Sequence, residues 1–271
     1  MGVTTIRAGA AAAVAALFAV GAAGGSGAGV GAAGARQQGG LPQGSEPVQL
    51  DPSDFTTAID NPYWPMTRGA RWVYRTTSPD GTRRRVVVVV TGRARLIANG
   101  ITARVVHDTV TEGSTIVEDT FDWYAQDREG NVWYLGELTK EYENGKVVST
   151  AGSWEAGVDG AQPGIIMPAH PTPGLSYRQE YYAGEAEDKA EIFRLDEQVQ
   201  VPYGHFTDVL MTKDTNALER RALEYTFYAP GIGPVLTLGV SGGDEREELL
   251  RVTGKRGEPG RGGRSLPASS R

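Results

Sequence analysis

The fold can be inferred from the stretch Ile116-Val-Glu-Asp-Thr-Phe-Asp-Trp-Tyr-Ala-Gln126 and from the segments that follow it, Asp127-Arg-Glu-Gly-Asn131 and Val132-Trp-Tyr-Leu-Gly-Glu137. Two runs rich in β-branched and aromatic residues flank a polar segment with a glycine, which is the pattern of a β-hairpin. In the first run, Phe121, Trp123 and Ala125 alternate with Thr120, Asp122 and Tyr124. This period places the two sets on opposite faces of a strand, and we expect the apolar set to be the buried one.

Similar landmarks occur in both halves of the chain. A turn glycine and a tyrosine are 24 residues apart in each, at Gly100 and Tyr124 and at Gly204 and Tyr228. Each half also ends on the pattern Gly-x-Val-x-x-Leu-Gly. We therefore predict an internal repeat over about 65–138 and 171–240, whose members should superpose strand for strand.

Reversing turns are indicated throughout the body of the chain. The signals are Pro79-Asp80-Gly81, Asn99-Gly100, Glu112-Gly113 and Asn144-Gly145, and each joins two β-rich runs. No window shows the 3.6-residue apolar period of a helix. The sequence predicts an all-β fold, an antiparallel curved sheet or half-barrel built from two similar four-to-five-strand units.

The Gly- and Pro-rich segment 151–173 shows no strand pattern but contains Trp154, Ile165, Ile166 and Met167. Elsewhere the run Val86 to Val90 is apolar on both pleat faces, so its strand should be covered on both sides. We expect 151–173 to be a long loop that caps the sheet and buries its own apolar groups there.

The N-terminus carries one charge, Arg7, followed by the Ala-rich stretch Ala8 to Ala23. This pattern is typical of a secretory signal peptide, which we place at 1–35. The stretch is too short and too rich in glycine to predict a membrane span. We interpret 36–53 as a flexible leader, 54–253 as a single β-domain and 254–271 as a disordered basic tail. The predicted location is secreted or extracytoplasmic, and the sequence leaves the oligomeric state open.

Charge is unevenly distributed along the chain. The net charge is −6, and removing Arg7 and the tail, which carries +4 from Gly254 onward, leaves −11 on the body. An acidic body argues against nucleic acid as a partner, because phosphates are bound by clustered Lys and Arg. The chain has no cysteine, so disulfides and thiolate ligands are excluded. No cofactor is predicted.

Two sets of motifs resemble known proteins. Asn61-Pro-Tyr-Trp-Pro-x-x-x-Gly69-x-x-Trp72-x-Tyr74 and Tyr228-Ala-Pro-Gly-Ile-Gly233 are broadly similar to features of bacterial lipoprotein-localisation carriers. That resemblance implies a concave antiparallel sheet around an apolar cavity, although this chain lacks the carriers' lipidated cysteine. A second set resembles a family of secreted bacterial proteins without a known activity: Phe121 to Asp127, Gly130 to Tyr134, Lys140 to Lys146 and Ser153 to Gly157.

Aromatic residues recur along the predicted strands and the cap. A sheet lined by Trp and Tyr with polar tips turned inward suits an apolar or sugar-ring ligand, whereas plain core packing explains the same residues equally well. The candidate ligand-binding residues are Trp72, Tyr74, Trp123, Trp133, Trp154 and Tyr181.

Catalytic signals are unspecific. The chain has no Gly-x-Ser-x-Gly elbow, but Glu155, Asp159 and His170 share the segment 151–173 and could serve acid-base chemistry from a loop. Whether the protein is an enzyme stays open, with binding favoured over catalysis.

No metal site is predicted. His107 and Asp108 are adjacent on one strand and point to opposite faces. His107 could join Asp119 or Asp122 of the facing strand, but a third ligand is missing and no pair of histidines has metal-binding spacing. We interpret His107 as an inner-face residue.

Three functions follow from these patterns. The first is a secreted binding or carrier protein for a hydrophobic small molecule or cell-envelope component. The second is an extracytoplasmic enzyme that uses the 151–173 segment. The third is a protein-interaction module without a ligand pocket.

We predict that function, if it uses a pocket, is insensitive to metal chelation. The three histidines cannot share one ion without straining strand geometry. The test is elemental analysis with a thermal melt in excess chelator. Stoichiometric zinc, copper or iron, or a melting temperature several degrees lower in chelator, would contradict the prediction.

Overall fold

The computed structural model describes residues 40–254, so the predicted signal peptide, and the predicted tail apart from Gly254, lie outside the described residues. One 3-10 turn, η1 (Pro52–Asp54), precedes the strands. The strands are β1 (Phe55–Thr56), β2 (Arg71–Thr77), β3 (Arg83–Leu96), β4 (Thr102–Glu112), β5 (Thr115–Asp127), β6 (Val132–Glu143), β7 (Lys146–Ser149), β8 (Trp154–Glu155), β9 (Gln162–Met167), β10 (Ser176–Arg178), β11 (Glu180–Tyr181), β12 (Asp188–Val201), β13 (Gly204–Asn216), β14 (Leu223–Ala229), β15 (Gly233–Ser241) and β16 (Arg246–Thr253).

The predicted turns lie where the strands reverse. Gly81, Gly100, Gly113 and Gly145 all have positive φ, a backbone region that costs glycine little and other residues more. At the β6–β7 turn Asn144 has φ 51° as well, as expected for an Asn-Gly hairpin turn. Short turns of this kind make sequence neighbours into antiparallel partners.

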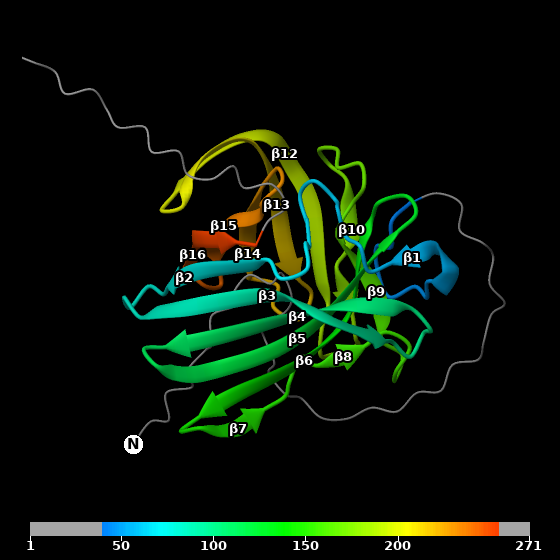
Figure 1. Cartoon of the computed structure of the whole chain (residues 1–271), viewed down its shortest axis with the longest axis horizontal. Helices are drawn as coiled ribbons and strands as arrows, with labels where there is room; N and C mark the ends of the chain where they lie inside the picture. The colour runs from blue at the N-terminus through cyan, green and yellow to red at the C-terminus, as the bar shows by residue number, and fades with distance from the viewer. Residues whose placement is uncertain (1–39, 255–271) are drawn as a thin grey trace, which may run out of the picture.

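The strands form one antiparallel sheet that is nearly closed and barrel-shaped (Figure 1). The all-β antiparallel prediction is confirmed, and the curvature exceeds that of a half-barrel. β16 joins the two halves of the chain, because it pairs with β15 on one side and with β2 on the other. The strand order is β10-β12-β13-β14-β15-β16-β2-β3-β4-β5-β6-β9-β11, with β1 on β5 and with β7 and β8 on β6.

The segment from Ser176 to Tyr181 closes the sheet. Its first part, β10, pairs with β12 and its second part, β11, pairs with β9, so both ends of the strand order lie in one short stretch of chain. Gly164 of β9 lies against this stretch so closely that a Cβ would overlap the carbonyl of Gln179. The Arg178 side chain is 1% exposed, and its Nη2 donates to the Pro163 carbonyl at 2.9 Å.

Residues 41–50 pack on the same closure. Arg178 Nη1 donates to the carbonyls of Gly44 and Glu46, and the Arg178 backbone N–H donates to the Pro42 carbonyl at 2.6 Å. Three side chains of this segment pack partly buried against the core: Leu41, Val48 and Leu50. The described part of the segment interpreted as a leader is therefore hydrogen-bonded to the barrel.

The expectation that 151–173 is a loop without strands is wrong. β8 and β9 lie within it, and both pair with β6. The segment extends the sheet at the edge of β6, because backbone N–H and C=O groups at a buried edge need partners. Its apolar groups are buried as expected: Trp154 is 4% exposed, and Ile165, Ile166 and Met167 are each 0% exposed.

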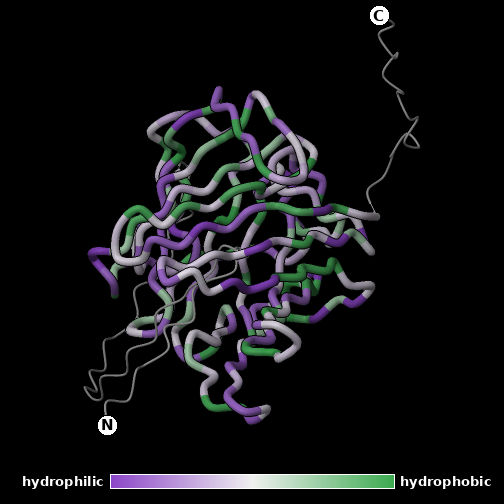
Figure 2. Tube along the Cα trace, turned by 90° about the vertical axis from the view of Figure 1, so that its left-hand side faces the viewer, coloured by the Kyte–Doolittle hydropathy of each residue, from purple (hydrophilic) through white to green (hydrophobic). Residues whose placement is uncertain are grey.

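The faces of β5 also differ from the expectation. Tyr124 points inward against Trp64, with ring centroids 5.9 Å apart, so Asp122 two residues earlier faces inward as well. Asp122 is 0% exposed, and Trp123 on the outer face is 4% exposed, with the Arg95 guanidinium 4.1 Å from its ring. Figure 2 shows hydrophilic and hydrophobic residues mixed along the stacked strands. Closing the sheet buries the inner face whatever its polarity.

Each half of the chain forms an antiparallel meander, β2 to β6 in the first and β10 with β12 to β15 in the second. Tyr124 pairs with Arg104, and Tyr228 pairs with Leu210. These partners lie four and six residues after the respective turn glycines, so the two hairpins differ in register by two residues. The internal repeat stays a prediction.

We predict that Gly164→Ala destabilises the barrel by about 1–3 kcal/mol, the usual cost of overpacking. The new Cβ would push β9 away from the Gln179 carbonyl. Urea unfolding measures the change, with Gly243→Ala as the control because a Cβ at Gly243 meets nothing within 4 Å. Equal stability of the two variants would contradict the prediction and would show that β9 can move away from the Gln179 carbonyl at little cost.

Candidate functional site

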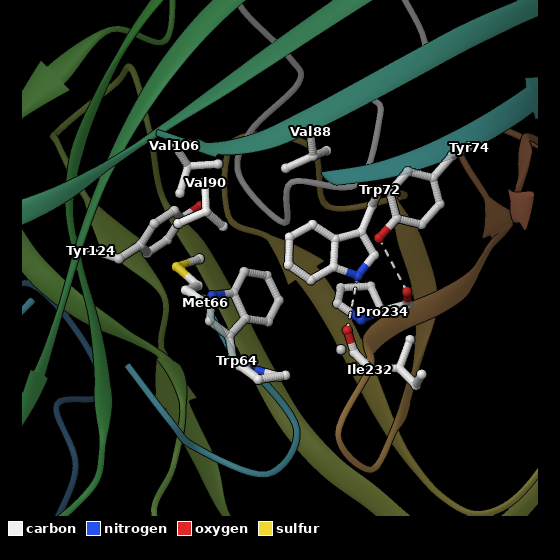
Figure 3. A pocket seen from close by; sticks show the side chains of 12 residues that line it. Trp64, Met66, Trp72, Tyr74, Val88, Val90, Val106, Tyr124, Ile232 and Pro234 are labelled. Atoms are coloured by element: carbon white, nitrogen blue, oxygen red, sulfur yellow. Dashed lines mark hydrogen bonds between the residues drawn. The ribbon is translucent and has the colours of Figure 1, made fainter. Parts of the chain in front are cut away.

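A cavity of about 40 Å³ lies inside the barrel between β2, β3 and the β14–β15 connection (Figure 3). Its walls are mainly aromatic and aliphatic. They consist of Trp64, Pro65, Met66, Trp72, Tyr74, Val88, Val90, Val106, Tyr124, Ile232, Gly233 and Pro234. In Figure 3 the valines of β3 and β4 point at Trp64 and Met66 from one side, while Trp72 and Tyr74 close the other.

The segment from Ile59 to Met66 packs its buried side chains Ile59, Trp64 and Met66 beside this cavity, and we call it the plug. Its two ends form an isolated β-bridge. Trp64 at its tip lies between Tyr124 and Tyr228, with ring centroids 5.9 Å from each. The plug thus brings together aromatic residues from β5 and β14, which lie far apart in the sheet.

Asn61 anchors the plug. Its backbone N–H donates to Gln126 Oε1 at 3.1 Å, and its Nδ2 donates to the carbonyls of Gly130 and Pro168, each at 3.1 Å. The backbone N–H of Trp64 in turn donates to the Asn61 carbonyl at 3.1 Å. The side chains at the tip therefore depend on one buried asparagine for their position.

The indole N–H and phenol O–H groups of these aromatic residues differ in whether they have hydrogen-bond partners. Trp72 Nε1 donates to the Ile232 carbonyl at 2.9 Å, and Tyr74 OH donates to the Pro234 carbonyl at 3.1 Å. Trp64 Nε1 and Tyr124 OH are buried without a hydrogen-bond partner among residues 40–254. Such groups are rare in folded proteins, and here both belong to residues that line the cavity.

Further along the inner face lies a set of buried carboxylates that we call the acidic layer: Asp108, Glu118, Asp122, Glu137 and Glu247. The first four come from the adjacent strands β4, β5 and β6, whereas Glu247 lies on β16, beyond β2 and β3. Hydroxyl groups bind some of their oxygens. Tyr134 OH donates to Asp122 Oδ1 at 2.8 Å, and Thr76 Oγ1 donates to Glu247 Oε2 at 2.9 Å.

Carboxylates continue around the inner face of the second half. Asp214 Oδ2 accepts from the hydroxyls of Thr226 at 2.7 Å and Thr212 at 3.0 Å. Glu180 Oε2 accepts from Trp154 Nε1 at 2.6 Å. The interior is therefore lined by acids and hydroxyls from both halves of the chain.

Burial raises the pKa of these carboxyl groups. Desolvation is the largest cause for Asp122, whose pKa rises to about 7 although the bond from Tyr134 opposes the shift. Burial, the neighbouring Asp122 and Glu118 hold the pKa of Asp108 well above its usual value. Burial also raises the pKa of Glu118 and of Asp214 to about 7.

The structure separates the predicted ligand-binding residues. Trp72 and Tyr74 line the cavity, and Trp154 packs edge-on against Tyr134 with ring centroids 5.3 Å apart. Trp123 lies on the outer face under Arg95. Trp133 and Tyr181 contact other parts of the wall: Trp133 Nε1 donates to Asp127 Oδ2 at 2.7 Å, and Tyr181 pairs with Gln162.

The three acid-base candidates of 151–173 have separate environments. Glu155 accepts from Arg95 Nη2 at 2.5 Å and from the Ala98 backbone N–H at 2.8 Å. Asp159 and His170 are exposed. No hydrogen bond or ion pair within residues 40–254 joins any two of the three.

His107 lies on the outer face, contrary to the inner-face interpretation, because its neighbour Asp108 faces inward. Its Nε2 is 2.5 Å from Asp119 Oδ1, and its ring stacks on Phe121 with centroids 4.3 Å apart. Among the described residues, no group of three or more His, Asp or Glu is placed to hold a metal ion. The chelation experiment remains the test of the metal prediction.

Sequence reasoning missed the plug and the acidic layer. The plug residues carry no periodic pattern, since Asn61 to Met66 form no strand. The acidic layer had a signal, because Asp122 alternates with buried aromatics on a strand that is covered on both faces. Alternation alone predicts that the apolar set is the buried one, which leaves Asp122 on the other face.

No protein-family model matches the sequence, and no curated protein matches it at a significant level. Among solved structures, the chain is similar to the crystal structure of a "putative lipoprotein" from Parabacteroides distasonis ATCC 8503, with 14% sequence identity and a TM-score of 0.39. The match covers 70% of this chain and 98% of that protein. Similarity at this level carries no argument about function. Within residues 40–254, no helix is long and apolar enough to span a membrane.

We predict that the protein is more stable at pH 5 than at pH 8. The pKa of Glu118, Asp122 and Asp214 is about 7 in the folded chain and near 4 when unfolded. Between these values the folded state binds more protons, so the free energy of unfolding falls as pH rises through 7. The melting temperature should fall by several degrees, since 1 kcal/mol shifts it by roughly 2–4 °C in a domain of this size.

Thermal melts across pH 5 to 8 check this expectation. Asp122→Asn should flatten the pH profile, because it removes one titrating group and keeps an acceptor for Tyr134. Asp196→Asn, at an exposed position of β12, should leave the profile unchanged. A melting temperature that rises toward pH 8 would contradict the shifted pKa values.

Proposed function

We propose that this protein is an extracytoplasmic binding protein that holds a small molecule with an apolar part inside the barrel, in the cavity beside Trp64. The observation that carries the proposal is the aromatic wall itself, in which Trp64 Nε1 and Tyr124 OH are buried without partners among residues 40–254. A binding pocket combines apolar walls with a few convergent polar groups. A core built for stability alone would satisfy those groups.

The cavity is smaller than the ligand it would hold. Its 40 Å³ accommodates about three water molecules, whereas pockets for small molecules span roughly 300–1,000 Å³. The plug is the element whose displacement would enlarge it, because Trp64 and Met66 form one wall and belong to no strand. Strands β2, β3 and β4 form the opposite wall and are held by continuous ladders.

The proposed location rests on the sequence. The Ala-rich N-terminal stretch after Arg7 is typical of an exported protein, and an exported chain without cysteine must be held together by its core. A barrel that closes nearly completely meets that requirement. Binding is favoured over catalysis because Glu155, one of the acid-base candidates, already accepts hydrogen bonds from the Arg95 side chain and the Ala98 backbone N–H.

The test is a titration with 1,6-diphenyl-1,3,5-hexatriene, a neutral hydrocarbon that fluoresces in apolar surroundings. The parent protein should bind it saturably. Val88→Phe should weaken binding by about tenfold or more, since the added ring occupies the cavity. Val88 faces the cavity from β3 (Figure 3).

Val87→Phe is the matched control, because Val87 is the next residue of the same strand and points to the outer face. It should bind the probe as the parent does. Absence of saturable binding by the parent, or unchanged binding by Val88→Phe, would reject the cavity as the binding site.

A further inference from the structure

Two carboxylates of the acidic layer each have an oxygen without a partner. Asp122 Oδ2 and Asp108 Oδ1 are buried and make no hydrogen bond with any group of residues 40–254. Asp122 is 0% exposed and Asp108 is 3% exposed. A buried carboxylate normally has partners for both oxygens, because an unpaired ionised group is costly away from water.

No cation of the described chain compensates these two groups. Neither carboxylate takes part in an ion pair within residues 40–254. Arg84, the inward-facing base of β3, binds Glu112 with a 3.3 Å contact. The charged groups that act on Asp108 are acidic, namely Asp122, Glu118 and Glu247. The site therefore has an excess of carboxyl groups, and a bound cation would stabilise their ionised form.

The strand partners of these two carboxylates line the cavity. Val106, which lines it, is the Cα partner of Asp122, and Val88 on the neighbouring strand is the Cα partner of Asp108. Tyr124, another lining residue, lies two positions after Asp122 on the same face of β5. A molecule whose apolar part lies in the cavity would place a polar end against the two unpartnered oxygens.

The chemistry of the site selects the charge of that end. An anion would meet carboxyl groups on several strands, whereas a cation favours the ionised form of Asp108 and Asp122. A metal ion needs several ligands in one shell, and the described residues form no such group. A protonated amine supplies positive charge with N–H donors, and the adjacent aromatic faces of Trp and Tyr also attract a cation.

We propose that Asp108 and Asp122 form a site inside the barrel for the protonated head of an organic amine whose apolar part occupies the cavity beside Trp64. This inference rests on the proposed function, because the cavity must open for such a molecule. It specifies the class of ligand, which is a primary amine with an aliphatic or aromatic tail.

The test compares three eight-carbon compounds at pH 7.5: n-octylamine, 1-octanol and octanoate. Each is titrated by calorimetry and by displacement of 1,6-diphenyl-1,3,5-hexatriene. The amine should bind about tenfold tighter than the alcohol, the scale of one charge-assisted hydrogen bond. Octanoate should bind more weakly than the alcohol, because it brings a further negative charge to the site.

Asp122→Asn and Asp108→Asn should each reduce the preference for the amine while 1-octanol binds as before. Asp119→Asn is the control, since Asp119 lies on the outer face of β5 with His107 and should keep the preference. The asparagine variants retain the size of the side chain and an oxygen acceptor. Thermal melts confirm that each variant is folded.

The outcomes separate the two proposals. If the hydrocarbon and 1-octanol bind but the amine shows no preference, or Asp122→Asn and Asp108→Asn both retain it, the amine site is wrong and the cavity stands. If none of the four compounds binds, both proposals are wrong. A preference for octanoate would overturn the charge assignment.

Discussion

The sheet closes at Ser176 to Tyr181, and this closure creates the interior that holds the cavity and the buried carboxylates. This stretch pairs with β12 and with β9, so it joins the last strands of the sheet from both directions. The closure requires Gly164, because any Cβ there would collide with the Gln179 carbonyl. It also requires the buried Arg178, which binds the carbonyls of Pro163, Gly44 and Glu46 and thereby ties residues 41–50 to the barrel.

A closed sheet makes an interior, and the interior of this barrel is polar along much of its length. Carboxylates on β4, β5, β6 and β16 face one another with hydroxyl groups between them. Burying them opposes folding at neutral pH, because desolvation and mutual repulsion raise their pKa well above the usual carboxyl values. A core selected for stability alone would place apolar residues there. We infer that this cost is retained for binding.

The plug connects the two halves of the barrel to the cavity. Trp64 lies between Tyr124 of β5 and Tyr228 of β14, and it reaches that position through the bonds of Asn61. The same indole forms a wall of the cavity (Figure 3). Movement of one short segment would therefore change both the packing between the halves and the space available to a ligand, while the ladders of the wall strands stay in place.

Strand period and turn chemistry act over a few residues, so the sequence predicts the all-β class, the antiparallel order of neighbours and the turns at Gly81, Gly100, Gly113 and Asn144-Gly145. It also indicates that Trp154 and Ile165 to Met167 are buried. Three features could not be read from local patterns: 151–173 adds strands to β6, Asp122 faces inward and His107 outward, and Trp64 contacts Tyr124 and Tyr228. These features depend on closure, which pairs segments more than a hundred residues apart. Local alternation identifies two faces of a strand, but the closed sheet decides which face lies inside.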